Sequence, residues 1–134
     1  MKSLMTALLL ASSFSAMAST VKIGDELLNY SCRDSSNQEY SVVISSKVNA
    51  KFDEQVEIPS ILSVKRVYPL GIEVMSVPQN FLGKFVYEDV MNNFVSNDKK
   101  TAFRLYADEL DQTSLTTIIN GKKSILNLDC NPKE

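Results

Sequence analysis

Two cysteines near opposite ends of the chain constrain its fold more than any other feature. Cys32 and Cys130 are the only cysteines among 134 residues. In an oxidising compartment two cysteines permit a single intramolecular bridge, and closing so long a loop removes unfolded-state entropy worth about 4–5 kcal/mol in the chain-entropy model. We therefore predict a Cys32–Cys130 disulfide that ties the start of the domain to its end. The alternative is a pair of free thiols or an intermolecular bridge.

The first 18 residues indicate that the chain is exported. A short, positively charged start (Met1-Lys2-Ser3) precedes an apolar run (Leu4–Ala11), and Ala16-Met17-Ala18 supplies the small residues that a signal peptidase reads. We expect cleavage before Ser19 and a single domain, residues 19–134, in the periplasm or the extracellular space. A membrane span needs about 20 apolar residues, and neither this run nor any later one is long enough.

Most of the remaining chain alternates with a period of two, which is typical of strands with one buried face. Leu28, Tyr30 and Cys32 alternate with polar residues, and Tyr40 to Ile44 largely repeats the pattern. Asp34-Ser35-Ser36-Asn37 lies between the two segments and has the composition of a turn. The sequence therefore predicts a hairpin with Cys32 on its first strand.

Prolines and a possible helix divide the middle of the chain. Glu57-Ile58-Pro59-Ser60 predicts a break, and further strands are expected from Ile61 to Val67 and from Leu70 to Met75, before Pro78. In residues 86–96 a strand and a short amphipathic helix both fit. The helix would bury one side through residues spaced i, i+3, i+4, i+7 and i+8, which are Tyr87, Val90, Met91, Phe94 and Val95.

The last third gives the clearest local prediction. Leu115–Ile119 is rich in β-branched residues, Asn120-Gly121 follows at once, and Ser124–Cys130 alternates again. Asn-Gly is the preferred pair for a two-residue type I′ hairpin, in which both residues need positive φ. With six to eight short strands in all, we expect a mainly β fold, an antiparallel sandwich or small barrel.

The residue types present exclude several kinds of chemistry. Without histidine, the Ser-His-Asp and Cys-His nucleophile arrangements are impossible. We expect no metal site and no cofactor, because the two cysteines pair with each other and no glycine-rich phosphate loop is present. Carboxylate chemistry is the remaining catalytic option, with Glu88-Asp89 and the group Asp108, Glu109 and Asp111 as the available acidic clusters.

The charge pattern does not indicate a nucleic-acid partner. The chain has 14 Lys and Arg against 16 Asp and Glu. The basic pairs Lys65-Arg66, Lys99-Lys100 and Lys122-Lys123 are scattered among acidic residues, whereas nucleic-acid binders concentrate their positive charge.

We accordingly expect a non-enzymatic binding or inhibitor-like module with a protein, glycan or lipid ligand. One cysteine early and one on the last strand is a layout similar to that of small periplasmic lysozyme inhibitors, although Tyr68-Pro69-Leu70-Gly71 does not match their Ser-Gly-x-x-Tyr loop. Lys65, Arg66 and Tyr68, two cations and an aromatic residue, form the predicted binding surface. The alternatives are an envelope assembly subunit that adds a strand to a partner and a small carboxylate-dependent hydrolase.

Overall fold

The computed structural model describes residues 19–52, 56–69, 72–88 and 90–133. The predicted signal peptide, residues 1–18, lies outside these ranges, so its cleavage stays a prediction. The first described strand begins at Ser19, and cleavage before that residue would leave every described strand intact. The described ranges contain ten strands, which are β1 (Ser19–Val21), β2 (Glu26–Arg33), β3 (Glu39–Ser46), β4 (Ala50–Phe52), β5 (Glu57–Tyr68), β6 (Ile72–Glu88), β7 (Met91–Ser96), β8 (Thr101–Tyr106), β9 (Thr113–Ile119) and β10 (Lys122–Pro132).

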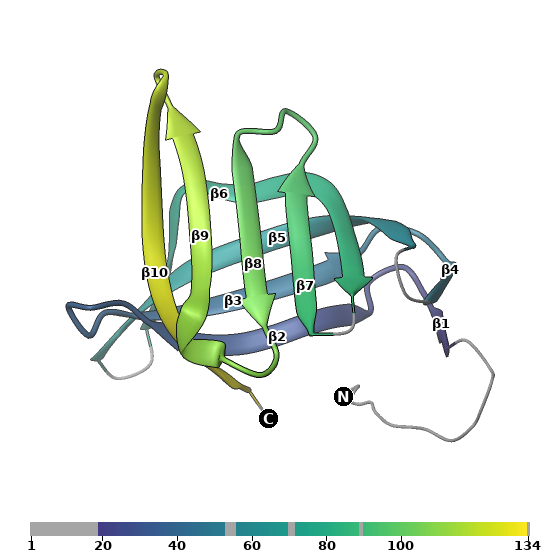
Figure 1. Cartoon of the computed structure of the whole chain (residues 1–134), viewed down its shortest axis with the longest axis horizontal. Coiled ribbons are helices and arrows are strands. Elements are labelled where there is room, and N and C mark those ends of the chain that lie inside the picture. Colours follow the sequence, from purple (N-terminus) through teal and green to yellow (C-terminus); the bar gives the residue numbers. More distant parts are fainter. Residues whose placement is uncertain (1–18, 53–55, 70–71, 89, 134) are drawn as a thin grey trace.

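Eight of the strands close into an antiparallel barrel (Figure 1), which confirms the predicted fold class. The order around the barrel is β10-β2-β3-β5-β6-β7-β8-β9, so each barrel strand pairs with the next barrel strand along the chain and β10 returns to β2. An even number of alternating strands lets the last pair antiparallel with the first, which removes most of the exposed sheet edge. The two remaining strands, β1 and β4, form a separate two-stranded ribbon.

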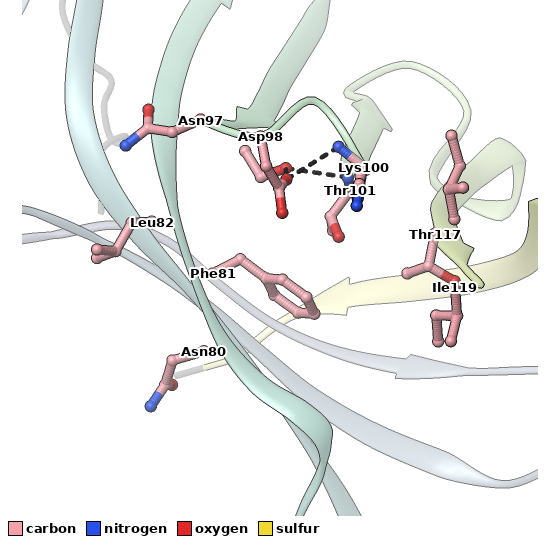
Figure 2. Close-up of a pocket in the computed structure, with 11 residues that line it drawn as sticks. Asn80, Phe81, Leu82, Asn97, Asp98, Lys100, Thr101, Thr117 and Ile119 are labelled. Atoms are coloured by element: carbon pink, nitrogen blue, oxygen red, sulfur yellow. Dashed lines mark hydrogen bonds between the residues drawn. The ribbon is translucent and has the colours of Figure 1, made fainter. Parts of the chain in front are cut away.

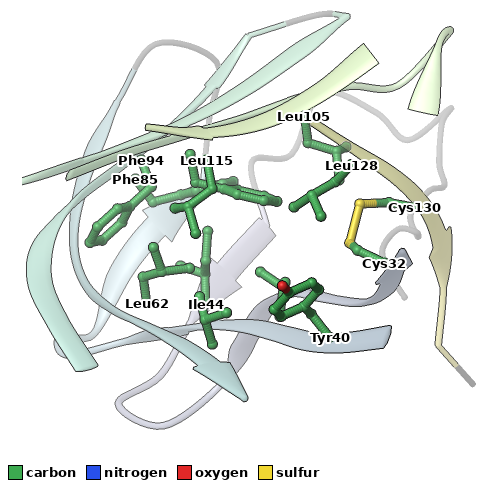
Figure 3. Close-up of a cluster of buried hydrophobic side chains, with 13 residues drawn as sticks. Cys32, Tyr40, Ile44, Leu62, Phe85, Phe94, Leu105, Leu115, Leu128 and Cys130 are labelled. Atoms are coloured by element: carbon green, nitrogen blue, oxygen red, sulfur yellow. A yellow bond between two sulfur atoms is a disulfide. The ribbon is translucent and has the colours of Figure 1, made fainter. Parts of the chain in front are cut away.

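The predicted disulfide is confirmed, and it lies at the seam where the barrel closes. Cys32 of β2 is directly opposite Cys130 of β10, with their Cα atoms 4.0 Å apart. Both cysteines are buried at the edge of the core (Figure 3). The seam itself is short, running from Asp129 to Pro132 on β10. The bridge therefore secures covalently the one strand pairing that joins the two ends of the chain.

The barrel interior is filled by side chains that meet across neighbouring strands. Phe85 lies opposite Phe94, Phe94 opposite Phe103, and Phe103 opposite Leu115. The three phenylalanines are at most 1% exposed. Such cross-strand aromatic neighbours add about 0.5–1.5 kcal/mol per pair beyond the burial of their area. Figure 3 shows this ladder facing Ile44 and Leu62 from the opposite wall of the barrel.

Both predicted turns have the expected backbone geometry. Asn120 (φ 53°) and Gly121 (φ 76°) have positive φ, and the flanking residues of β9 and β10 pair directly across a two-residue turn. In the β2–β3 turn, one carboxylate oxygen of Asp34 accepts the backbone N–H groups of Ser36 and Gln38, at 2.9 and 3.0 Å. Asn37 adopts the positive φ (67°) that this tight turn requires.

Of the two structures that fitted residues 86–96, the strand is present and the helix is not. No α-helix occurs among the described residues, and this segment forms the end of β6, a turn and β7. Burial follows a period of two along β7: Asn92 and Phe94 are buried, whereas Val95 is 44% exposed and Val90, in the turn, is 46% exposed. Two apolar positions of the expected helical face therefore face solvent. The apolar residues of this segment fitted both the helical period and the strand period of two, and the pairing of β7 with β8 favours the strand.

The predicted break at Glu57–Ser60 is also wrong, because Pro59 lies inside β5. Its carbonyl accepts the N–H of Lys47 at 2.9 Å. The nitrogen and carbonyl of one residue face the same neighbouring strand in an antiparallel sheet. The Pro59 nitrogen therefore faces the space beyond the end of β3, which stops at Ser46. The missing N–H thus removes no hydrogen bond to β6, which is how a sheet tolerates proline.

The strand expected to end before Pro78 instead continues to Glu88 as part of β6. Its pairing with β5 is irregular in between, since Ser63 lies opposite Asn80 but Lys65 lies opposite Met75. The proline falls within this irregular stretch, where ladder hydrogen bonds are interrupted anyway. Leu70, where we expected that strand to begin, lies outside the described residues.

The two ends of the barrel differ. One end carries the β2–β3, β5–β6, β7–β8 and β9–β10 connections, and we call it the open end. The other end carries the β6–β7 connection and the 3₁₀ turn η3 (Leu110–Gln112), whose Leu110 packs against the core. Two hollows formed by described residues lie at the open end, and the candidate binding site is one of them.

Candidate binding site at the open end of the barrel

A hollow of about 390 Å³ lies at the open end between β6, the β7–β8 turn and β9 (Figure 2). Each wall comes from a different part of the chain, and closure of the barrel brings them together. The hollow is lined by Asn80, Phe81, Leu82, Ser96, Asn97, Asp98, Lys100, Thr101, Thr117, Ile118 and Ile119.

Four apolar side chains, Phe81, Leu82, Ile118 and Ile119, form part of the walls of this hollow beside a larger number of polar residues. Phe81 is half-buried against the core and projects between the other walls in Figure 2. Ile118 and Ile119 are 36% and 50% exposed, although both are large and aliphatic. They extend past the last β8–β9 residue pair, where only the N–H of Ile118 still reaches the Lys100 carbonyl, at 2.8 Å. Exposed apolar side chains gathered beside polar ones are typical of an interaction site.

The polar wall of the hollow is held in place by Asp98. One of its carboxylate oxygens accepts the Ser96 hydroxyl at 2.6 Å and the Lys100 backbone N–H at 3.0 Å. The N–H of Thr101 donates in turn to the Ser96 hydroxyl at 3.0 Å, as the dashed lines of Figure 2 indicate for this turn. The Ser96 hydroxyl and then the Lys100 amide hold the pKa of Asp98 below its usual range. Its carboxylate therefore shapes the turn as an anion and is a poor proton donor.

A second hollow, of about 280 Å³, lies where the β2–β3 turn meets the end of β5. Arg33 and Glu39 form an ion pair across it at 3.1 Å, and Glu39 also accepts the Ser31 hydroxyl. The side-chain amide of Gln38 donates to the Val67 carbonyl at 3.1 Å, which joins the turn to β5. The hollow is lined by Arg33, Asn37, Gln38, Glu39, Val67, Tyr68 and Pro69.

The structure brings together two of the three residues that the sequence predicted as a binding surface. Arg66 and Tyr68 lie on the same face of β5 and share a side-chain hydrogen bond, which raises the pKa of the Arg66 guanidinium. Lys65 lies between Ser41 and Met75 in the sheet and, by the alternation of a strand, on the opposite face from Arg66. The predicted trio is therefore not one surface, whereas Tyr68 does line the second hollow.

Arg66 and Tyr68 stand beside a hydrogen-bonded pair that sequence reasoning did not select. The Tyr40 hydroxyl donates to the second carboxylate oxygen of Asp34 at 3.1 Å. The Gln38 amide first, and then the Tyr40 hydroxyl and the Ser36 amide, lower the pKa of Asp34. Burial first, and then the bond to Asp34, raise the pKa of Tyr40. The group combines a cation, an anion and two phenols at the rim of the open end.

The acidic clusters considered for catalysis do not line either hollow. Asp108, Glu109 and Asp111 are exposed around η3, at the other end of the barrel. Glu88 accepts a hydrogen bond from the side-chain amide of Asn93 at 3.1 Å, and Asp89 lies outside the described residues. The acids that do line the hollows, Asp98 and Glu39, are engaged in the turn and the ion pair described above.

Two features are absent from the part of the chain that the structure describes. It contains no group of three or more His, Cys, Asp or Glu side chains placed to hold a metal ion. In the same ranges no helix combines the length and apolarity needed to cross a membrane.

Sequence reasoning missed the larger hollow, because its walls come from segments that are distant in the chain. The available signal was the pair Ile118-Ile119 directly before Asn120-Gly121. Two consecutive aliphatic residues at the tip of a hairpin cannot both face a core, so one of them must be exposed.

Comparison with protein-family models, curated proteins and solved structures finds no match for this chain.

Proposed function

We propose that this chain is an exported, non-enzymatic binding module, inhibitor-like in its action, that uses the open end of its barrel. The ligand inserts an apolar group into the larger hollow, and the surrounding polar rim orients it. Among protein, glycan and lipid ligands, a protein loop fits this description best, because protein interfaces combine a small apolar centre with a polar margin.

The observation that carries the proposal is the exposure of Ile118 and Ile119 around a hollow at the barrel mouth. A barrel that stores a lipid needs an internal cavity, whereas this interior is occupied by the phenylalanine ladder. The recognition surface is then the rim. Such a shallow, partly apolar site suits a side chain presented by another molecule.

The local electrostatics support binding over carboxylate catalysis. A general acid needs a raised pKa so that it carries a proton near neutral pH. The hydrogen bonds to Asp98 work in the opposite direction and keep it ionised. Export is supported by the disulfide, since such bridges persist in oxidising compartments.

The test is retention of a ligand by the immobilised mature protein. The protein would be exposed to the envelope extract and culture medium of its own producing cells, and retained protein, glycan and lipid identified by mass spectrometry. Ile119→Asp places a charge in the hollow and should reduce retention of the wild-type ligand by about tenfold or more, the scale of a lost hot spot. Val95→Asp is the matched control, because Val95 is 44% exposed on β7 outside the hollow.

Equal retention by the two variants would refute the proposed site. A wild-type protein that retains nothing above background would refute the binding function itself. Both variants must first show the thermal unfolding of the wild-type protein, so that a loss of binding is not a loss of fold.

A further inference from the structure

Two basic pairs that are far apart in the chain meet beside the larger hollow. Lys99 and Lys100 belong to the β7–β8 connection, and Lys122 and Lys123 begin β10 directly after its turn. The strands β8 and β9 are neighbours, and the N–H of Ile118 donates to the Lys100 carbonyl at 2.8 Å, so the two connections are in contact. Figure 1 shows both at the top of the barrel. The fold therefore gathers at the open end charges that are scattered in the sequence.

Two of these four lysines border the hollow directly. Lys100 is part of its wall, as is Ile119. Lys122 lies opposite Ile119 in the β9–β10 hairpin, and residues directly opposite each other project on the same face with Cβ atoms about 4.5–5.5 Å apart. A group inserted into the hollow would thus have a lysine on the β7–β8 side and another on the β10 side.

The positive charges are not neutralised by the surrounding protein. All four lysines are exposed, and in the part of the chain that the structure describes none of them forms an ion pair. Asp98 is the one acid in the two connections, and one of its carboxylate oxygens is already bound by the Ser96 hydroxyl and the Lys100 amide. The exposed acidic cluster around η3 lies at the other end of the barrel. A surplus of one charge around a concave site attracts partners of the opposite charge.

We infer that the partner of the open end is an acidic protein segment, with carboxylates on both sides of the apolar side chain that enters the hollow. This inference rests on the proposed function and adds to it the charge of the partner. Each exposed ion pair contributes little by itself. Complementary charge nevertheless accelerates encounter and disfavours cationic partners, so the lysines select the partner that the apolar walls then hold.

The form of the site favours a protein over other anionic macromolecules. A bilayer presents a flat layer of headgroups, whereas this site is a hollow that a single projecting side chain can fill. Nucleic-acid interfaces are polar and strongly positive throughout. Here Leu82, Ile118 and Ile119 contribute aliphatic surface to the walls beside the cations. A protein loop supplies an apolar centre and a charged margin within one short segment.

Peptide titration followed by NMR of the mature, isotope-labelled protein tests the inference. The probes are cyclic peptides in which one leucine is flanked on both sides by glutamate, by glutamine or by lysine. The glutamate peptide should shift the amide signals of Lys100, Ile119 and Lys122, and it should bind about tenfold more tightly than the glutamine peptide at low ionic strength. The lysine peptide should not bind. High salt should remove most of the difference between the first two, because it screens exposed charges.

A double charge reversal tests the lysines themselves. Lys99→Glu combined with Lys122→Glu should weaken binding of the glutamate peptide by about tenfold or more. Lys22→Glu combined with Lys51→Glu makes the same change in net charge beside and within the β1–β4 ribbon, outside both hollows, and should leave binding unchanged. Both double variants must first show the thermal unfolding of the wild-type protein.

The outcomes separate this inference from the proposed function. Equal binding of the glutamate and glutamine peptides at the hollow would overturn an acidic partner and leave the binding site itself standing. Absence of binding by the glutamate peptide would also overturn the inference, whereas the site is tested independently by retention of ligand in Ile119→Asp. Vesicles of phosphatidylglycerol and phosphatidylcholine in equal parts, and a short oligothymidylate, are the competing probes. Tighter binding of either one to the same amides would overturn a protein partner.

Discussion

Gly83 is the position at which the closed barrel should be least tolerant of an added atom. It lies on the inner face of β6, opposite Ser96 of β7. A Cβ built there would overlap the carbonyl oxygen of Val95, and it would lie 2.6 Å from Phe94 Cζ and 2.7 Å from Ser96 Cα. Two of these three atoms are backbone atoms of β7, which side-chain rotation cannot move. Gly83→Ala can therefore be accommodated only by separating β6 from β7.

The expected cost follows from this geometry. Overpacking a well-filled core costs about 1–3 kcal/mol, and a clash with backbone belongs at the upper end, about 3 kcal/mol. For a domain of this size that corresponds to a fall in Tm of about 10–15 °C. Urea unfolding followed by tyrosine fluorescence and far-UV circular dichroism would measure it, since the chain has five tyrosines and no tryptophan.

Two further variants separate the reasoning from a general intolerance of substitution. Gly24→Ala meets nothing within 4 Å, so only its positive φ of 91° should cost stability, about 1–2 kcal/mol. Adding Phe94→Leu to Gly83→Ala removes the contact with the ring but leaves the contacts with the backbone, so it should not restore stability. A Tm for Gly83→Ala within about 2 °C of the wild type, a change that is small on the scale of overpacking costs, would refute the close approach of β6 and β7.

Three other variants test the seam and the turns. Replacing Cys32 and Cys130 by serine opens a loop with a sequence separation of 98 and should lower the free energy of unfolding by about 4–5 kcal/mol in denaturant titration. Gly121→Val should cost about 1–2 kcal/mol in the same assay, because Gly121 has φ +76° and no neighbour within 4 Å, so the effect is on the backbone alone. Asp34→Asn should remove part of the acid sensitivity. The pKa of Asp34 is lowered in the folded state, so its ionised form stabilises the fold above the ordinary value of 3.8, and this contribution is lost as pH falls through the lower folded value. Thermal melts at decreasing pH should show the difference between wild type and variant shrinking below pH 3.8.

Each of these results can contradict its premise. Unchanged stability of the serine variant would mean that the seam does not constrain the unfolded chain. An unchanged melt for Gly121→Val would mean that the turn is not type I′. A stability difference for Asp34→Asn that stays constant through the acid range would mean that the Asp34 carboxylate does not stabilise its turn.

Local rules predicted the parts of this fold that depend on adjacent residues. Asn120-Gly121 specifies its turn because few other residue pairs adopt positive φ twice in succession. The disulfide was predictable from the count of cysteines together with the expectation of an oxidising compartment, and it also correctly linked the first barrel strand to the last. The same reasoning could not choose a barrel over a sandwich, because that choice depends on whether β10 returns to β2.

The errors arose where tertiary pairing overrides a local pattern. The apolar residues between Tyr87 and Val95 fit a helix and a strand equally well, and the helical version required Asn92 to face solvent. Instead Asn92 is buried with its side-chain carbonyl oxygen lacking a protein partner among the described residues, while Val95 is exposed. At Pro59 the rule that proline breaks strands failed because the missing N–H faces a position that β3 does not reach. The larger hollow was not predictable, because three separate segments form its walls.

The claim that the open end binds a partner is tested most directly inside the producing cell. A photo-crosslinking amino acid would replace Ile119, which lines the hollow, and in a second strain Val95, which is similarly exposed on β7 outside it. Irradiation followed by mass spectrometry of the recovered protein would identify the adducts. We predict one dominant adduct at position 119 that is absent at position 95. The same adducts at both positions, or an adduct at position 95 alone, would contradict recognition at the open end.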